Sequence, residues 1–336
     1  MTEKEFNYIQ APAEPMVLEG FAWYEKDREF CRLPQSGLPV LSSEMNRLAW
    51  NTAGGTLRFK TDSVRISIKY TLSEWRKYSP AMPATGHSGL DVYAGSGQNY
   101  QYIGNMQPAE NKLEQVLEVE NETGHQDITI YFPTYNGITN IEIGITEGST
   151  ISAPTPRTEK GRVVVYGPSI AQGGNASRPA CTYPCILSRW LNIEVVNLGF
   201  SGNCLGEPEM AHIINELTMR ALVMEYDHNA PNPEHLWKTH EPFYKIIREK
   251  NPDLPVIFVS KTNTSATDPE DCDRRAAITA TYENALKRGE NVQFINGLYL
   301  MGTKDRDMCT TDGGHPNDLG FYRMAEGIFP VLSKMV

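Results

Sequence analysis

The sequence lacks the features that mark disulfide-stapled, membrane-spanning and nucleic-acid-binding proteins. Its 336 residues include only six cysteines, at spacings that match no zinc module, so reduced and mostly buried thiols are expected. No apolar run approaches the ~20 residues that a bilayer-spanning helix needs, and the mean hydropathy is −0.42. Acidic residues outnumber basic ones by 41 to 31, and the resulting net charge of −10 repels a phosphate backbone. Neither a membrane nor a nucleic acid is therefore an expected partner.

The N-terminus, MTEKEFNYIQAPAEP, is charged and polar where a secretory signal has an apolar stretch. As written, the chain is expected to be cytoplasmic, or secreted or periplasmic if a signal was removed. The length suits two domains of roughly 150 residues each, and the oligomeric state stays open.

The first half of the chain alternates apolar and polar residues in short runs separated by turn residues. This period of two, rich in Val, Ile, Tyr and Phe, is typical of antiparallel strands with one buried face. The runs are residues 56–62, 64–70, 90–94, 128–132 and 141–145. They predict an all-β domain, a β-sandwich or jelly roll, over residues 1–150.

A stretch rich in Ser, Thr, Pro and Gly at residues 146–162 is the expected domain boundary. Beyond it the apolar residues form short continuous runs, at residues 162–166, 194–198, 221–226, 256–260 and 292–296. Helical spacing occupies residues 233–250, 271–288 and 318–332. Strands buried on both faces and separated by helices predict a parallel α/β domain over residues 160–336.

Polar segments follow three of these apolar runs, and a fourth precedes the last helix. They are GPSIAQGG at 167–174, GFSGN at 199–203, DHNAP at 227–231 and DGGHPN at 312–317. Ligands of an open parallel sheet bind beyond the carboxyl ends of its strands, so these segments are expected to lie together.

The residue types in these segments suit acyl transfer. A serine nucleophile needs an imidazole to accept its proton and a carboxylate to orient the imidazole, and Ser169, His315 and Asp312 are the candidates. The tetrahedral oxyanion needs preorganised donors. The backbone N–H groups of Ser169 and Gly202 and the side-chain amide of Asn229 are able to supply them.

In order and separation, the four segments resemble the four sequence blocks of the SGNH (GDSL-like) hydrolase superfamily. The resemblance implies a flavodoxin-like fold with Ser169 as nucleophile, His315 as base and Asp312 as its orienter. It also implies an oxyanion hole made by Ser169, Gly202 and Asn229. The family's oxyanion glycine lies five residues beyond the strand-end asparagine, here Asn197, which favours Gly202 over Gly199. Gly199 is instead expected to relieve a tight turn.

The N-terminal half strengthens the resemblance. Residues 89–93 (GLDVY) are similar to the GxDLY element of a β-sandwich domain that precedes some SGNH hydrolases, and residues 51–59 (NTAGGTLRF) fit the same domain. The similarity covers the chain from about residue 40 to its end. It implies a cofactor-free esterase that removes small acyl groups, often acetyl, from an acylated sugar or another small ester.

Two departures from the family pattern leave other functions open. Pro168 and Ala230 stand where the family usually has aspartates. They favour a carbohydrate-binding protein with an inactive hydrolase domain as an alternative. An acyltransferase, thioesterase or longer-chain lipase would use the same nucleophile.

Several other polar residues invite a role. His228 is equally consistent with contacting substrate and with hydrogen-bonding its own loop. A metal site among Glu225, Asp227, His228, His235 and His240 is not expected, because no His-Glu-x-x-His spacing occurs there. In the sandwich, Asp91 is expected to satisfy turn N–H groups and Tyr93 to pack in the core.

Overall fold

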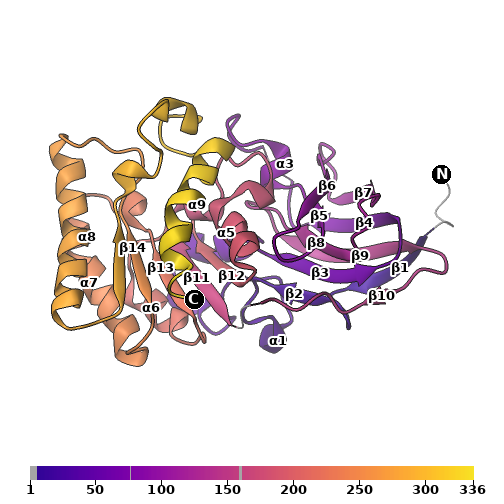
Figure 1. Cartoon of the computed structure of the whole chain (residues 1–336), viewed down its shortest axis with the longest axis horizontal. Helices are drawn as coiled ribbons and strands as arrows, with labels where there is room; N and C mark the ends of the chain where they lie inside the picture. The colour runs from indigo at the N-terminus through magenta and orange to yellow at the C-terminus, as the bar shows by residue number, and fades with distance from the viewer. Residues whose placement is uncertain (1–5, 76, 159–160) are drawn as a thin grey trace.

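The computed structural model describes residues 6–75, 77–158 and 161–336. Within these ranges two antiparallel sheets face one another in the N-terminal half, and a parallel sheet flanked by helices forms the C-terminal half (Figure 1). The predicted fold, an α/β domain preceded by a β-sandwich, is confirmed.

The sandwich has one sheet of four strands and one of six. The first sheet runs in the order β1 (Phe6–Ala11), β9 (Ile138–Thr146), β4 (Arg65–Leu72) and β7 (Glu114–Glu120). The second runs β10 (Ile151–Ser152), β3 (Thr56–Thr61), β8 (Asp127–Tyr131), β5 (Asp91–Ala94) and β6 (Gln101–Asn105), with β2 (Val17–Glu19) also paired to β3. Alternate side chains such as Ile66, Ile68 and Ile143 fill the core between the sheets.

Of the two sandwich residues singled out in the sequence, Asp91 has its expected role and Tyr93 does not. Asp91 accepts a hydrogen bond from the backbone N–H of Ala180 at 2.9 Å and pairs with Arg178 at 3.1 Å, which confirms that it satisfies a backbone N–H group. The prediction for Tyr93 is wrong. Its ring packs with Tyr131, Ala180 and Cys185 in a separate cluster, away from the sandwich core, because alternation along β5 turns it toward the C-terminal half.

The parallel sheet has the strand order β12 (Glu194–Gly199), β11 (Arg162–Gly167), β13 (Ala221–Met224), β14 (Val256–Val259) and β15 (Val292–Ile295). Counted within this half, the order is 2-1-3-4-5, which is that of flavodoxin-like sheets. Val163 and Val165 face one apolar cluster and Val164 and Tyr166 the other, so the sheet is buried on both sides.

Helices cover both faces of this sheet. One face carries α4 (Ser169–Gln172), α5 (Tyr183–Leu191) and α9 (Asp318–Leu332), and the other carries α6 (Pro208–Ile214), α7 (Pro233–Lys250) and α8 (Pro269–Lys287) (Figure 1). Shorter helical turns are α1 (Tyr24–Asp27), η2 (Leu38–Val40), α2 (Ser43–Ala49), α3 (Ala84–His87), η3 (Pro179–Cys181), η4 (Asp227–Asn229), η5 (Gly297–Tyr299) and η6 (Arg306–Cys309). Among the helices of the described ranges, none combines the length and apolar character needed to cross a bilayer.

Side-chain caps explain where the long helices begin. The Asn232 side chain accepts the N–H of His235, and Pro233 is the first residue of α7. The Asp268 side chain likewise accepts the N–H of Asp271, and Pro269 is the first residue of α8. Asn317 caps α9 by accepting the N–H of Gly320. This last cap fixes the chain just after the 312–317 segment.

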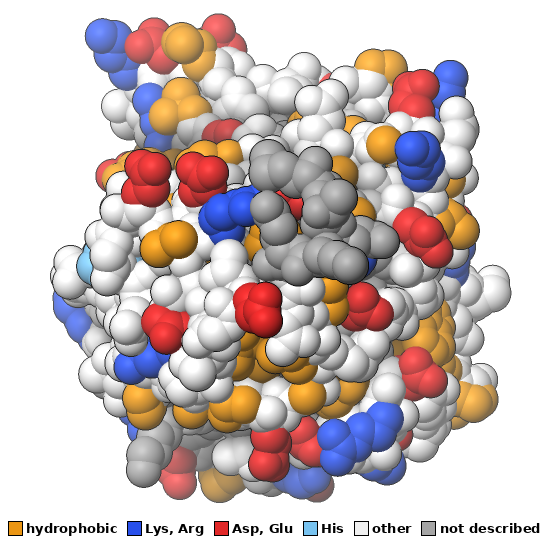
Figure 2. All heavy atoms as spheres, turned by 90° about the vertical axis from the view of Figure 1, so that its right-hand side faces the viewer, with side chains coloured by type: hydrophobic (Ala, Val, Ile, Leu, Met, Phe, Trp, Pro, Cys, Tyr) orange, Lys and Arg blue, Asp and Glu red, His pale blue; other side chains and the backbone are white. Residues whose placement is uncertain are grey.

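The surface at the sandwich end carries charges of both signs. Figure 2 shows Lys and Arg side chains scattered among Asp and Glu side chains, with neither sign gathered into one broad patch.

The segment between β2 and β3 joins the two halves. Trp23, Leu33 and Leu48 belong to the apolar cluster of the α/β half. Arg32, fully buried, donates to the carbonyl oxygens of Asn51 (2.6 Å), Leu48 (2.8 Å), Asn197 (3.0 Å) and Gly199 (2.6 Å). Its guanidinium also lies 4.5 Å from the ring centre of Phe200.

Replacing Arg32 should therefore destabilise the whole chain. In Arg32→Met four carbonyl oxygens lose a charged donor inside the protein, and we expect the free energy of unfolding to fall by at least about 3 kcal/mol. Thermal unfolding should show a Tm lower by roughly 5–10 °C. Arg28→Met is the control, since the Arg28 side chain is 66% exposed and forms its ion pair with the exposed Glu25. Equal Tm values for the two variants would contradict this account of Arg32.

Candidate active site

The four polar segments meet at the carboxyl edge of the parallel sheet. Ser169 is the first residue of α4, two residues after the end of β11. Gly199 ends β12, and a Cβ there would lie 2.2 Å from the backbone nitrogen of Gln172. The expectation that Gly199 relieves a tight turn is thus wrong: it allows α4 to lie directly against β12.

Ser169, His315 and Asp312 form a continuous line of hydrogen bonds. Ser169 Oγ lies 2.9 Å from His315 Nε2, and His315 Nδ1 lies 2.8 Å from Asp312 Oδ2. Ser169 is 8% exposed, whereas the His315 and Asp312 side chains are about 40% exposed. The serine therefore lies at the base of the site, and the imidazole covers it from the loop before α9.

The surroundings of Asp312 favour its charged form. Burial raises the pKa of this carboxyl, but hydrogen bonds from the backbone N–H and ring of His315 and from the N–H of Gly314 outweigh burial and lower the pKa to about 2. Asn175 adds a donor at 3.3 Å from Asp312 Oδ2. Sequence reasoning missed Asn175, whose only local signal is the glycine-rich turn before it.

The three predicted oxyanion residues lie on separate turns. The N–H of Ser169 belongs to the first turn of α4, where no helical carbonyl can accept it. Gly202 has a positive φ of 73°, and a Cβ there would meet only open space. Asn229 Oδ1 accepts the N–H of Cys204 at 3.2 Å, which leaves the two N–H donors of its amide for another acceptor.

Family models match both halves of the chain. A model described as the N-terminus of SGNH-hydrolase-type esterases, named GxDLY, matches residues 6–151, and a model of the GDSL-like Lipase/Acylhydrolase family matches residues 160–333. The chain belongs to the GDSL-like lipase/acylhydrolase family. It is therefore a carboxylic ester hydrolase by family.

Solved structures share this two-part fold. A GDSL-like lipase from Bacteroides ovatus is 28% identical with a TM-score of 0.87, and the match covers 98% of each chain. The salicylyl-acyltransferase SsfX3 from a tetracycline biosynthetic pathway is 20% identical with a TM-score of 0.80, covering 98% of this chain and 97% of that one. An acetyl xylan esterase from the rumen bacterium Butyrivibrio proteoclasticus is 11% identical with a TM-score of 0.61, covering 98% of each chain. The comparison with curated proteins found no significant match.

In this GDSL-like hydrolase, the sandwich half reaches the nucleophile. The Tyr135 hydroxyl, from the loop after β8, donates to the carbonyl oxygen of Ser169 at 3.3 Å. Gln172 of α4 donates to Asn51 Oδ1 and to the Thr134 carbonyl, each at 3.1 Å. Gln172 Oε1 in turn accepts the N–H of Ser201 at 2.9 Å, next to Gly202.

His228 bonds to a neighbouring loop. Its Nε2 accepts the backbone N–H of Thr262 at 3.0 Å and lies 3.1 Å from the Thr262 hydroxyl. Burial, with smaller contributions from Lys261 and His315, lowers the pKa of His228 to about 3. The ring is therefore neutral, with its proton on Nδ1.

The other residues considered for a metal site have separate partners. Asp227 accepts the N–H of Lys261 at 2.7 Å and pairs with the buried Arg274 at 3.3 Å. His235 Nε2 lies 2.7 Å from the Leu205 carbonyl, and His240 Nδ1 lies 2.9 Å from the Thr281 hydroxyl. Arg274 also donates to the Ala230 carbonyl at 2.9 Å, so it fixes both sides of the Asn229 turn.

Glu225 is buried directly behind the nucleophile turn. Tyr183 donates to its Oε2 at 2.7 Å, and a Cβ on Gly167 would lie 3.3 Å from the same oxygen. Its Oε1 has no hydrogen-bond partner among the described residues. Burial raises the pKa of Glu225 to about 8, so the carboxyl is protonated at neutral pH.

Glu225 should make stability depend on pH in a defined direction. Because its pKa is raised above 4.5 in the folded state, the fold binds this proton more tightly than the unfolded chain does. Its stabilising effect is complete below pH 4.5 and is lost as the pH rises to about 8. We expect the Tm of the wild type to fall by several degrees between pH 5 and pH 9 relative to that of Glu225→Gln. Parallel Tm curves for the two proteins would contradict this.

Proposed function

We propose that this hydrolase is a serine esterase that removes a short acyl group, preferably acetyl, from a carbohydrate. The Ser169–His315–Asp312 line of hydrogen bonds is the observation that carries the proposal. A buried serine oxygen 2.9 Å from an imidazole nitrogen, with a carboxylate 2.8 Å from the other ring nitrogen, is the arrangement that nucleophilic acyl transfer requires.

In the first half of the reaction, His315 Nε2 takes the proton of Ser169 as Oγ attacks the ester carbonyl. The carbonyl oxygen becomes an oxyanion and accepts hydrogen bonds from the N–H groups of Ser169 and Gly202 and from Asn229 Nδ2. The ionised Asp312 stabilises the imidazolium. As the tetrahedral intermediate collapses, the bond to the sugar oxygen breaks and His315 gives its proton to that oxygen.

In the second half, water replaces the sugar. His315 takes a proton from water, the hydroxide attacks the acyl-Ser169 carbonyl, and a second oxyanion forms in the same place. Collapse of this intermediate breaks the bond to Oγ and returns the proton from His315 to Ser169. The carboxylic acid leaves and the enzyme regains its starting state.

A polar pocket next to Asp312 supports a carbohydrate substrate. It has a volume of about 660 Å³ and is lined mainly by hydroxyl, amide and charged side chains, among them Asn263, Thr264, Arg306 and Asp307. Such a lining, which contains no large apolar side chain, suits the hydroxyl groups of a sugar.

The inactive-domain alternative rests on Pro168 and Ala230. Pro168 precedes α4 with extended backbone, and Ala230 contributes its carbonyl oxygen to Arg274. Neither replacement interrupts the hydrogen bonds of Ser169, His315 and Asn229, which favours the active enzyme.

Replacing the nucleophile should abolish hydrolysis. For Ser169→Ala acting on a chromogenic acetate ester, we expect kcat/KM to fall by at least about 10³-fold. Ser333→Ala is the control, since Ser333 follows the C-terminal helix α9. Equal rates for wild type and Ser169→Ala would exclude this mechanism. In a series of esters with longer acyl chains, activity that rises with length would instead identify a lipase.

The role of Asp312 separates a triad from a Ser-His dyad. In Asp312→Asn the amide loses the charge that stabilises the imidazolium, and we expect kcat on the acetate ester to fall by on the order of 10²–10⁴-fold with KM little changed. Asp305→Asn, in the loop ahead of the 312–317 segment, should match the wild type. A wild-type kcat for Asp312→Asn would show that Ser169 and His315 act without it.

A further inference from the structure

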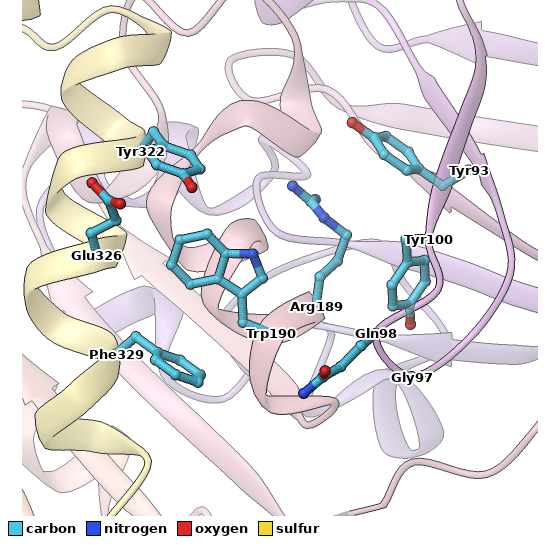
Figure 3. A pocket seen from close by; sticks show the side chains of 9 residues that line it. All are labelled: Tyr93, Gly97, Gln98, Tyr100, Arg189, Trp190, Tyr322, Glu326 and Phe329. Atoms are coloured by element: carbon cyan, nitrogen blue, oxygen red, sulfur yellow. The ribbon is translucent and has the colours of Figure 1, made fainter.

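A second pocket lies between the sandwich and the helices α5 and α9. Its volume is about 600 Å³, and its walls come from the turn between β5 and β6 on one side and from both helices on the other (Figure 3). Ser169, His315 and Asp312 do not line it. The pocket is therefore separate from the candidate active site.

The helix wall of this pocket is aromatic. Tyr322 and Phe329 lie on one face of α9, and Trp190 of α5 stands almost perpendicular to both rings, with centroid distances of 5.4 and 5.6 Å. The Tyr322 side chain is 47% exposed, which leaves part of this large aromatic ring open to a ligand. On the opposite wall, Tyr93 and Tyr100 face the same space (Figure 3). Flat rings on two sides suit a flat ligand with apolar faces.

Polar side chains also line this pocket. The side chains of Gln98 and Glu326, which line the pocket, are exposed. Arg189 donates to the Ala180 carbonyl at 2.9 Å, and its guanidinium lies 5.0 Å and 5.5 Å from the ring centres of Tyr93 and Tyr131. Glu326 brings one negative charge and Arg189 one positive charge, so the lining as a whole is neutral.

We infer that this pocket binds a neutral oligosaccharide, the glycan part of the substrate, at a distance from the ester. Sugar rings present apolar C–H faces that pack on aromatic rings, and a rim of hydroxyl groups that would bond to Gln98, Arg189 and Glu326. An acyl chain would leave those polar groups buried without partners. A strongly anionic ligand would meet Glu326 in a protein of net charge −10.

The position of the pocket suits a polymer. The helix α9 begins at Asp318, just after the His315 loop, and Phe329 lies eleven residues further along it. At 1.5 Å per residue the pocket extends roughly 16 Å along α9 from the active-site edge. A chain of several sugar units is long enough to occupy both places. The choice of a glycan as the ligand thus rests on the proposed function. The existence of the pocket does not depend on that function.

Calorimetric titration of Ser169→Ala with neutral cellohexaose, xylohexaose and mannohexaose tests the inference. We expect at least one of them to bind, and Tyr322→Ala in the same background to weaken binding about three- to tenfold. The control is Tyr299→Ala, since Tyr299 is 64% exposed and lies outside the pocket. Binding that is insensitive to Tyr322→Ala, or absent for all three sugars, would overturn the inference.

Two further measurements separate this inference from the proposed function. The chromogenic acetate ester should be hydrolysed equally by the wild type and Tyr322→Ala, whereas KM for an acetylated polysaccharide should rise in the variant. Hydrolysis of the small ester without sugar binding would overturn only the second site, and sugar binding without hydrolysis would overturn only the proposed reaction. Binding of decanoate that is lost in Tyr322→Ala would overturn the inference and show that the pocket takes an acyl chain. A dimer in sedimentation that is lost in Tyr322→Ala would overturn it and show that a second copy of the chain covers the pocket.

Discussion

The buried guanidinium of Arg32 is the contact on which the geometry of the site depends. It binds the end of β12 through the Asn197 and Gly199 carbonyls and the residues before β3 through the Leu48 and Asn51 carbonyls. A charge with this burial is tolerated only because so many of its donors are satisfied. It holds the two halves in one arrangement, and the active-site edge of the parallel sheet lies directly beside it.

A chain of hydrogen bonds leads from this contact to the oxyanion turn. Asn51, whose carbonyl accepts from Arg32, uses its side chain to hold Gln172 of α4, and Gln172 holds the N–H of Ser201. Gly202 follows. The backbone that would bind the oxyanion is thus positioned by residues of the sandwich half. Because preorganised donors require such support, we regard the sandwich as part of the catalytic apparatus.

The two N-terminal motifs, residues 51–59 and 89–93, also hold the two halves of the chain together. In the 51–59 motif, Asn51 contacts α4, and a Cβ on Gly54 would collide with the Asn197 side chain at 2.5 Å. In the 89–93 motif, Asp91 accepts the N–H of Ala180 and pairs with Arg178. Both motifs are contacts between the halves of the chain.

Local sequence determined much of the fold. The helices α7 and α9 begin and end where the pattern predicts, because Asn232 and Asn317 cap them and apolar residues recur at helical spacing. The sequence pattern does not predict β7 although its burial alternates strictly, because the buried Gln115 and the exposed Val116 interrupt the alternation of apolar and polar residues. The short strand β2 has too few residues for a periodic signal.

The residues of the candidate site also differ in how far the sequence predicts them. Ser169, His315, Asp312 and Asn229 could be proposed because each follows a recognisable strand or precedes a capped helix. Asn175, Tyr135 and Arg32 could not, because each acts on a residue more than a hundred positions away or in the other half. The wrong prediction for Tyr93 has the same cause, because its partners Ala180 and Cys185 lie in the C-terminal half and a contact between the halves leaves no local pattern in the sequence.

Covalent labelling tests the central claim most directly. Incubating the protein with a fluorophosphonate and locating the adduct by mass spectrometry asks whether one serine is activated. The account predicts a single adduct on the peptide that contains Ser169, and its loss in His315→Ala. An unlabelled protein, or an adduct on another serine, would contradict the claim that Ser169, His315 and Asp312 act as one catalytic unit.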